Sequence, residues 1–236
     1  MADSVVITMI GRGQSDFARF PSFAARLYAS LTRGRAIYEQ QREIASDLAV
    51  RVDHGRILDV GTGPGYLLLE LRRLNRSLEL FGLDISPAMV DLARRNLPEH
   101  DAVIKLGSIQ FAPFDDNFFD LITCTGSFYL WDQPVDCLND VFRILKPGHA
   151  AILFETYRDC DRNAVRRAIA GNLRDENLAR RLIAPRLFSK QLAMTYDTKE
   201  METIFRKTRF ARSYAMERIA LAGVPAWLRI SLLKRL

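Results

Sequence analysis

The sequence predicts an α/β protein built on parallel strands, and the main observation is the stretch 56–71, RILDVGTGPGYLLLEL. A short apolar run leads into three glycines at alternating positions, and a leucine-rich segment with helical spacing follows at once. A second apolar run, at 78–84, ends in Asp84 and precedes a predicted helix over 88–96. Strands that alternate with helices in this way are typical of a parallel sheet with helices packed on its faces.

The glycine turn after the first strand indicates a binding site. Gly61, Gly63 and Gly65 permit positive φ or a close approach of the backbone to a ligand. The helix that starts directly after the turn has N–H groups without intrahelical acceptors, which we expect to face the ligand. We therefore interpret the turn as a cradle for a nucleotide-type ligand.

An acidic residue follows this turn at the distance that a nucleoside site requires. Asp84 lies about twenty residues beyond the turn, the spacing at which dinucleotide folds place a carboxylate against a ribose. Its carboxylate, at the end of the neighbouring strand, is able to accept hydrogen bonds from two ribose hydroxyls. Two adjacent strand ends are therefore predicted to bind one nucleoside.

The rest of the chain continues the alternation. Residues 1–15 are expected to form a mobile arm, and helices before the first strand form an N-terminal helical cap over 16–52. The further elements are predicted as strands over 102–106, 119–125 and 150–155, a helix over 132–145, helices within 161–193, a helix over 198–207, and closing strands over 210–219 and 226–233 joined by 223–225.

Four segments carry a resemblance to a known family: ILDVGTGPG, LFGLDISPAMVDLAR, GSIQFAPFDDNFFDLITC and VFRILKPGHAAILFE. In order and spacing they resemble the motifs of class I S-adenosylmethionine-dependent methyltransferases, most of all the small-molecule group that includes the quinone-biosynthesis C-methyltransferases. The resemblance implies a Rossmann-like seven-stranded sheet, mostly parallel with an antiparallel last strand and flanked by helices. It also implies S-adenosylmethionine as methyl donor and S-adenosylhomocysteine as product.

The resemblance also implies a set of cofactor-binding positions. They are Asp59, Gly61, Thr62, Gly63, Gly65, Asp84, Ile85, Ser108, Ile109, Cys124, Thr125 and Gly126. Ser108 departs from the family, which commonly has an acidic side chain there to accept a hydrogen bond from the adenine amino group. The serine hydroxyl or the backbone of Ile109 is left for that contact, and Cys124 is equally well explained as a buried core thiol.

The chemistry is expected after the fourth strand, because open α/β sheets bind ligands outside the carboxyl ends of their strands. The residues there, 125–132, lack the Asn-Pro-Pro-Tyr type of motif, which disfavours methylation of amino groups on DNA bases. Tyr129 and Trp131 are candidate walls for the substrate, or they simply cover the sheet edge. Tyr129 and Asp132 are the candidates for a general base, whereas His149, at the start of the fifth strand, is expected to be structural.

The charge is unevenly distributed along a chain of a length suited to a single domain, residues 1–236. Residues 1–157 carry 16 Lys and Arg against 20 Asp and Glu, whereas residues 158–236 carry 18 against 8. The segment 158–195 is expected to be a basic helical insertion or lid that sets specificity. Its arginines either lie on solvated helix faces or attract an acidic substrate, an anionic lipid or nucleic acid.

Other features limit the class of protein. No apolar run reaches the roughly 18 residues of a membrane span, and no signal peptide is recognisable, so a cytoplasmic protein is expected. The three cysteines lack a CxxC pair and the three histidines are scattered, which predicts reduced thiols and no metal.

Four functions follow in order of preference. A methyltransferase acting on a small molecule leads, with an acidic acceptor compatible with the basic lid, and an RNA methyltransferase is less favoured because no RNA-binding motif is present. An NAD-dependent oxidoreductase is disfavoured because Tyr66 occupies the third glycine position of GxGxxG. A non-catalytic S-adenosylmethionine-binding or interaction protein stays open because of Ser108.

Overall fold

The computed structural model describes residues 34–98 and 100–236. The predicted arm over 1–15, and the part of the predicted cap over 16–33, lie outside the described residues. Among the described helices, none is both long and apolar enough to cross a lipid bilayer.

The core of the fold is a seven-stranded sheet with the order β3-β2-β1-β4-β5-β7-β6. Its strands are β1 (Gly55–Val60), β2 (Leu78–Asp84), β3 (Val103–Leu106), β4 (Phe119–Thr125), β5 (Leu145–Thr156), β6 (Tyr214–Leu221) and β7 (Val224–Leu233). The neighbours from β3 to β5 pair in parallel, and β7 is antiparallel to both β5 and β6. This arrangement confirms the predicted fold class, including the reversed last strand.

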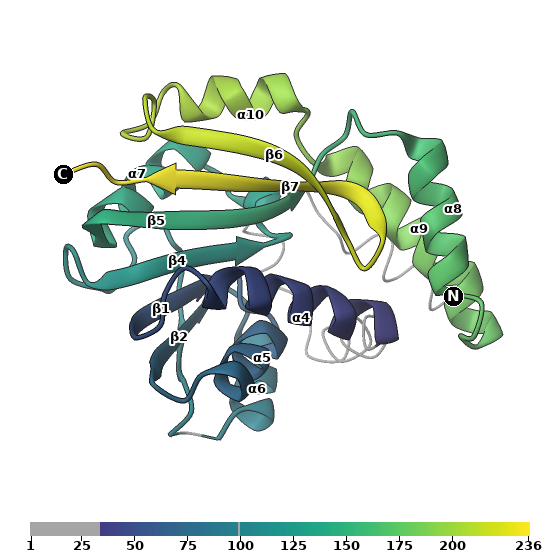
Figure 1. Cartoon of the computed structure of the whole chain (residues 1–236), viewed down its shortest axis with the longest axis horizontal. Coiled ribbons are helices and arrows are strands. Elements are labelled where there is room, and N and C mark those ends of the chain that lie inside the picture. The colour runs from purple at the N-terminus through teal and green to yellow at the C-terminus, as the bar shows by residue number, and fades with distance from the viewer. Residues whose placement is uncertain (1–33, 99) are drawn as a thin grey trace.

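Helices cover both faces of the sheet (Figure 1). They are α4 (Arg35–Ala49), α5 (Tyr66–Leu74), α6 (Pro87–Asn96), the 3₁₀ turn η1 (Phe128–Leu130), α7 (Pro134–Ile144), α8 (Arg162–Asn172), α9 (Leu178–Met194) and α10 (Thr198–Phe205). Alternation along β5 places Ala151 and Leu153 in the core beneath α7 and α10, and Ile152 and Phe154 in the core beneath α4 and α5. Because both faces are buried, the central strands are almost continuously apolar.

Two helical segments lie at the carboxyl edge of the parallel strands. The hairpin of α8 and α9 stands beyond the ends of β4 and β5, and α4 crosses in front of the sheet toward it (Figure 1). Helix α4 is fastened to the C-terminal strands, because Glu43 accepts a hydrogen bond of 2.8 Å from the Ala222 amide and Asp47 pairs with Arg229. The described part of the N-terminal helical cap is therefore held over this edge.

Several element boundaries differ from the sequence predictions, and three of these differences have a structural reason. Strand β5 begins at Leu145 instead of residue 150, because its first residues stay in the sheet around a register shift opposite Phe119. Strand β6 begins at Tyr214 instead of residue 210, because 208–213 form hydrogen-bonded turns that bury Phe210 in the core. The β6–β7 turn consists of Ala222 and Gly223, both with positive φ, and the strand resumes at residue 224. The three cysteines are buried and free.

Candidate active site

The glycine turn between β1 and α5 is fastened to the end of β2. The amides of Gly61 and Thr62 both donate to the Leu83 carbonyl, at 2.8 and 3.2 Å, and the Gly63 amide donates to Asp84 Oδ2 at 2.8 Å. The Gly65 amide donates to the Thr62 carbonyl at 3.0 Å. These N–H groups of the turn are therefore already bonded within the protein. The part of the turn in ligand binding is to let the backbone approach the ligand closely.

Glycine occupies the three positions of the turn for different structural reasons. A Cβ on Gly61, whose φ is +72°, would come within 2.2 Å of the Ser127 Oγ atom, and one on Gly65 would come within 2.6 Å of Leu97 Cδ1. A Cβ on Gly63 would meet no atom of the described residues within 4 Å. Gly61 and Gly65 thus allow packing against neighbouring elements, whereas Gly63 borders open space in which a ligand fits.

Two buried carboxyl groups lie beside the turn. Asp84 accepts the Gly63 amide on Oδ2 and the Ser86 amide, at 2.9 Å, on Oδ1, and each oxygen retains acceptor capacity. Burial raises the pKa of Asp84, against the lowering effect of these backbone hydrogen bonds. Burial, with a smaller contribution from the charge of Asp84, raises the pKa of Asp59 to about 7. A cationic group bound here would stabilise both carboxylates.

The end of β4 is held by a third buried carboxyl group, Glu155 on β5. Its Oε1 atom accepts the Phe128 amide at 2.7 Å and contacts Cys124 Sγ at 3.8 Å. Burial raises the pKa of Glu155 to about 8, so the group is mostly protonated at neutral pH. The Ser127 hydroxyl donates to the Val60 carbonyl at 3.1 Å, which fixes the β4 end against the glycine turn.

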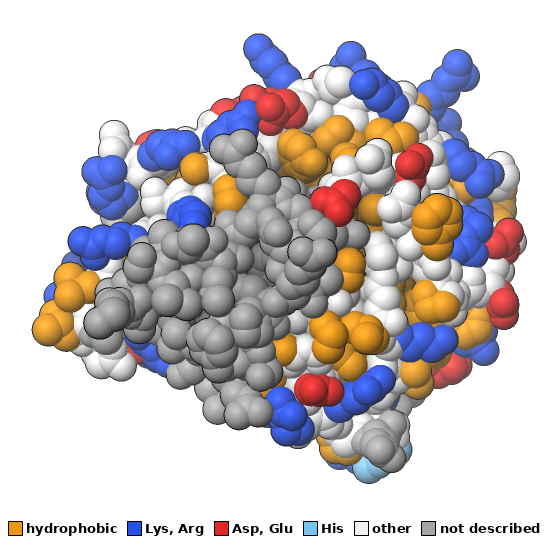
Figure 2. Space-filling view, turned by 180° about the vertical axis from the view of Figure 1, so that it is seen from behind, with side chains coloured by type: hydrophobic (Ala, Val, Ile, Leu, Met, Phe, Trp, Pro, Cys, Tyr) orange, Lys and Arg blue, Asp and Glu red, His pale blue; other side chains and the backbone are white. Residues whose placement is uncertain are grey.

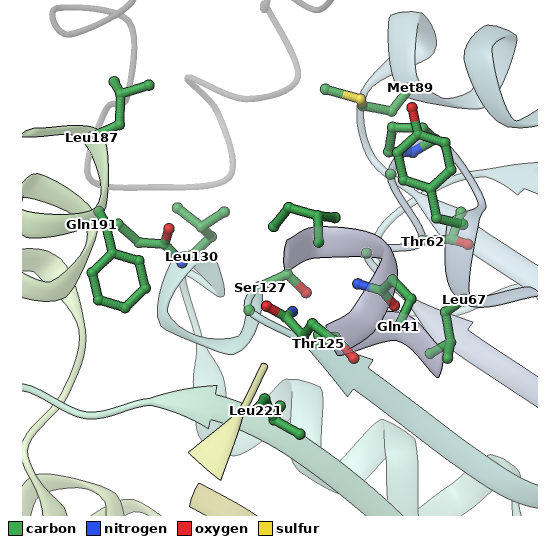
Figure 3. Close-up of a pocket in the computed structure, with 18 of the residues that line it drawn as sticks. Gln41, Thr62, Leu67, Met89, Thr125, Ser127, Leu130, Leu187, Gln191 and Leu221 are labelled. Carbon is green, nitrogen blue, oxygen red and sulfur yellow. The ribbon is translucent and has the colours of Figure 1, made fainter. Parts of the chain in front are cut away.

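A cavity of about 370 Å³ joins these groups to the underside of the helical hairpin. Met89 and Thr62 lie at one end, Leu187 and Gln191 of α9 at the other, and Thr125 and Ser127 between them (Figure 3). The end beneath the hairpin is mainly apolar, with a wall formed by Leu130, Trp131, Ile169, Leu173, Ile183, Ala184, Leu187, Phe188, Leu221, Val224 and Trp227. The site therefore has a polar end suited to a nucleoside and an apolar chamber next to it.

Among the buried oxygen atoms that have no hydrogen-bond partner within the described part of the chain, two belong to cavity residues outside the glycine turn. They are Gln41 Oε1 on α4 and Thr125 Oγ1 at the end of β4. Because buried polar atoms are nearly always hydrogen-bonded, these two are suited to bind a ligand or water in the cavity.

The structure gathers most of the site residues predicted from the sequence. Those that line the cavity are Asp59, Gly61, Thr62, Gly63, Asp84, Ile85, Ser108, Ile109, Thr125, Gly126 and Tyr129. Gly65 packs behind the turn, Cys124 is buried behind the β4 end, and Asp132 does not line the cavity. The Ser108 Oγ atom accepts a hydrogen bond of 3.1 Å from the Gln110 amide while lining the cavity.

Sequence reasoning missed several contributors to the cavity. Gln41 lies on a helix that was expected to cover the site, but nothing in the local pattern singled it out. Ser127 lies just after β4, and Glu155 lies near the end of β5, where it supports the cavity from behind; both are recognisable only by that position. Leu221 and Trp227 enter from the β6–β7 hairpin, and no local signal predicts this, because it depends on the antiparallel pairing of β7.

The arginines of segment 158–195 mostly point away from the cavity. Of the seven at positions 162, 166, 167, 174, 180, 181 and 186, only Arg180 lines it, and that side chain pairs with Glu176 at 2.8 Å. The other six are exposed. The hairpin therefore presents a mainly apolar surface to the cavity, with Arg180 paired to Glu176, and a basic surface to the outside.

The fold and the site together define a class. An open, mostly parallel sheet with a glycine turn after its first strand and a carboxylate at the end of the next is the arrangement typical of nucleoside-binding α/β domains. Comparison with known proteins is more specific, because residues 58–153 match the family model described as a methyltransferase domain. Over this segment the chain is similar to methyltransferase domains, and its fold is similar to that of solved S-adenosylmethionine-dependent methyltransferases.

Individual relatives agree with this assignment. A demethylmenaquinone methyltransferase of Deinococcus radiodurans is 31% identical over 148 residues, which cover 61% of each protein. A putative S-adenosyl-L-methionine-dependent methyltransferase of Methanococcus maripaludis has a similar structure, with a TM-score of 0.69 and 19% identity. The match covers 92% of this chain and 94% of that one. The plantazolicin methyltransferase BpumL, in complex with SAH and a triazolic desmethylPZN analog, gives a TM-score of 0.70 at 13% identity. The match covers 99% of this chain and 98% of that one. The chain spans about 60% or less of the length of the first curated relatives it matches.

Proposed function

We propose that this protein transfers a methyl group from S-adenosylmethionine to a small, uncharged and largely apolar acceptor. The observation that carries the proposal is that one continuous cavity joins the carboxylate-lined end beside the glycine turn to the apolar chamber under α9. A donor and an acceptor bound at the two ends would meet beside Thr125 and Gly126.

The residues at the polar end fit the cofactor. In our assignment Asp84 binds the ribose hydroxyls, and Gly63 leaves room for the part of the cofactor that continues from the ribose. Ser108 and Ile109 border the adenine. Asp59 and Asp84 favour a ligand that carries positive charge, which S-adenosylmethionine has on its sulfonium and ammonium groups and NADH lacks. When bound, this cofactor supplies an activated methyl group.

The chain's own contribution to the reaction would be positioning and the exclusion of water. Alignment of two reactants is worth about 7–11 kcal/mol in favourable intramolecular reactions, so a methyl transfer does not need an obligatory catalytic side chain. Tyr129, which lines the cavity, is our candidate for removing an acceptor proton, and Asp132 is the weaker candidate because it does not line the cavity.

The nature of the chamber favours an uncharged acceptor. An acidic acceptor was suggested by the arginines of the hairpin, but the six outward arginines do not line the cavity and Arg180 is already paired with Glu176. The relatives named for demethylmenaquinone and plantazolicin are consistent with a small-molecule acceptor. A mainly apolar chamber also gives no support to RNA as the acceptor. We retain the view of 1–236 as one domain, with α4 and the α8–α9 hairpin covering its site.

Titration calorimetry tests the proposal. We expect S-adenosylmethionine and S-adenosylhomocysteine to bind with micromolar affinity and NADH not to bind. Incubation with labelled S-adenosylmethionine and a panel of neutral aromatic and prenylated compounds, with acidic metabolites and tRNA as comparisons, then identifies the acceptor by label uptake. Absence of binding by both sulfur compounds would refute the proposal.

A further inference from the structure

The outer surface of the α8–α9 hairpin has a composition that the binding site does not explain. Helices α8 and α9 carry Arg and Lys but no Asp or Glu. Six arginines of the segment are exposed, at positions 162, 166, 167, 174, 181 and 186, and none of them has a carboxylate within ion-pair distance among residues 34–98 and 100–236. The surface therefore carries a net positive charge, which Asp161 before α8 and Asp175 in the connecting loop offset only in part.

Large apolar side chains are exposed within this basic surface. Leu178 is 70% exposed and Leu182 is 52% exposed, and with Arg181 they occupy positions i, i+4 and i+3 of α9. By helix geometry these three share one face, with Arg186 one turn further on. Arg174 lies in the short loop that leads into the same helix. We call this set, Arg174, Leu178, Arg181, Leu182 and Arg186, the hairpin tip.

Helix α9 is thus apolar on two opposite sides. The side facing the cavity carries Ile183, Leu187 and Phe188, and the side facing outward carries Leu178 and Leu182. Figure 2 shows Lys and Arg side chains together with hydrophobic ones at the left edge of the molecule, which is the edge formed by α8 and α9. The inner side is explained by the acceptor chamber, and the outer side calls for a different partner.

We propose that the hairpin tip docks on an anionic lipid bilayer surface. Arginines attract acidic headgroups, and their aliphatic stems tolerate partial burial beside leucines that enter the boundary of the acyl chains. A nucleic acid would match the charge but not the leucines, because single strands bind by base stacking and no aromatic side chain is among the five residues of the tip. Docking by this hairpin would bring the acceptor chamber to the surface from which an apolar acceptor leaves the membrane, a consequence that rests on the proposed function.

Flotation with vesicles tests the docking surface without any cofactor or acceptor. The full-length protein is mixed with vesicles of phosphatidylcholine alone or with 30 mol% phosphatidylglycerol. We expect at least tenfold stronger partitioning onto the anionic vesicles, and a steep loss of binding as salt is raised. Equal binding to both kinds of vesicle, or to neither, would overturn the proposal.

Two double variants assign the binding to the tip. Arg181→Glu with Arg186→Glu, and separately Leu178→Ser with Leu182→Ser, are each expected to lower partitioning at least tenfold. The matched control is Arg76→Glu with Leu74→Ser, a pair at the end of α5 whose side chains are likewise exposed. This control is expected to change partitioning less than twofold, and circular dichroism spectra are expected to be unchanged in all variants.

The remaining outcomes also decide the question. Loss of binding in the control as large as in the tip variants would show only a general charge effect and overturn the proposal. The proposal would also be overturned if the tip variants weakened binding to tRNA and left vesicle binding unchanged. Failure of cofactor binding in the calorimetric test would refute the proposed function without altering these vesicle results, so the two failures are distinguishable.

Discussion

At the scale of single residues, the site depends on buried carboxyl groups whose cost of burial is only partly offset. Asp84 receives two backbone hydrogen bonds, Asp59 has its pKa raised to about 7 and Glu155 to about 8. A protein retains such groups at one edge of a sheet when a ligand or a local conformation requires them. Asp84 faces the cavity, and Glu155 holds the backbone of the loop after β4.

Replacement of Asp84 tests the assignment of the ribose contact. Asp84→Asn keeps one acceptor oxygen but turns the other into a donor, which leaves a ribose hydroxyl unmatched. We expect a loss of about 1–3 kcal/mol in the binding of S-adenosylhomocysteine, a reduction of about 5-fold to about 150-fold by calorimetry. The control is Asp91→Asn, an exposed carboxyl on α6. Equal affinities of both variants would show that Asp84 does not contact the cofactor.

Gly61 tests whether the turn is fixed by packing. Gly61→Ala would place a methyl group 2.2 Å from Ser127 Oγ in a residue with a φ of +72°. We expect the free energy of unfolding to fall by about 2 kcal/mol or more, measured by urea denaturation. Gly171→Ala is the control, because a Cβ there meets nothing within 4 Å and alanine favours the helix by about 0.5–1 kcal/mol. A loss of similar size in both variants would contradict this explanation.

At the scale of elements, the same α9 helix separates two environments. Its inner side closes an apolar chamber with Leu187 and Phe188, and its outer side carries exposed arginines and leucines. Helix α4 closes the chamber from another direction and is itself fastened to the β6–β7 hairpin by Glu43 and Asp47. Specificity for the acceptor is therefore expected to depend on helices that lie outside the nucleoside-binding half of the sheet.

A charge placed in the chamber tests this division. Leu187→Arg would put a cation into the apolar chamber, whereas Ala193→Arg places one on an exposed position of the same helix. We expect Leu187→Arg to weaken binding of the neutral fluorescent dye Nile red at least about fivefold, because a desolvated charge is costly. Affinity for S-adenosylhomocysteine should stay the same in both variants. Unchanged dye binding in Leu187→Arg would mean that the chamber is not the apolar site.

At the scale of the whole molecule, the buried acids make stability depend on pH. The pKa values of Asp59 and Glu155 are raised to about 7 and about 8 from the ordinary values of 3.8 and 4.5, so the folded chain binds more protons than the unfolded chain between these limits. Their contribution to stability is therefore fully present below about pH 4 and is lost as the pH rises through 7 and 8.

Urea denaturation at a series of pH values measures this dependence. We expect the free energy of unfolding of the unmodified protein to fall between about pH 5 and about pH 8, and Glu155→Gln to make that fall smaller and to remove its part above about pH 7. Glutamine keeps an oxygen that accepts the Phe128 amide, so the loop after β4 should be retained. Glu39→Gln, at an exposed position of α4, serves as the control. Parallel pH profiles for all three proteins would contradict the raised pKa of Glu155.

The sequence by itself determined the sheet, the order of its elements and which residues meet beside the glycine turn. These follow from local signals, namely alternating apolar runs, the three glycines and a carboxylate at a strand end, because parallel strands bring their carboxyl ends together at one edge. The resemblance to methyltransferases supplied the expected number of strands and the cofactor, and the structure agrees on the sheet.

Only the tertiary structure decided the character of the acceptor chamber and the direction of the charges. Whether Arg180 or Arg181 faces the cavity depends on how α9 packs, and the pattern of α9 is ambiguous because apolar residues lie on both of its sides. The contributions of Leu221 and Trp227 depend on the antiparallel pairing of distant strands. Likewise, Glu155 acquires its raised pKa from burial by residues far along the chain. These properties are non-local, because burial and orientation are set by contacts between elements and not by the spacing of residues within one.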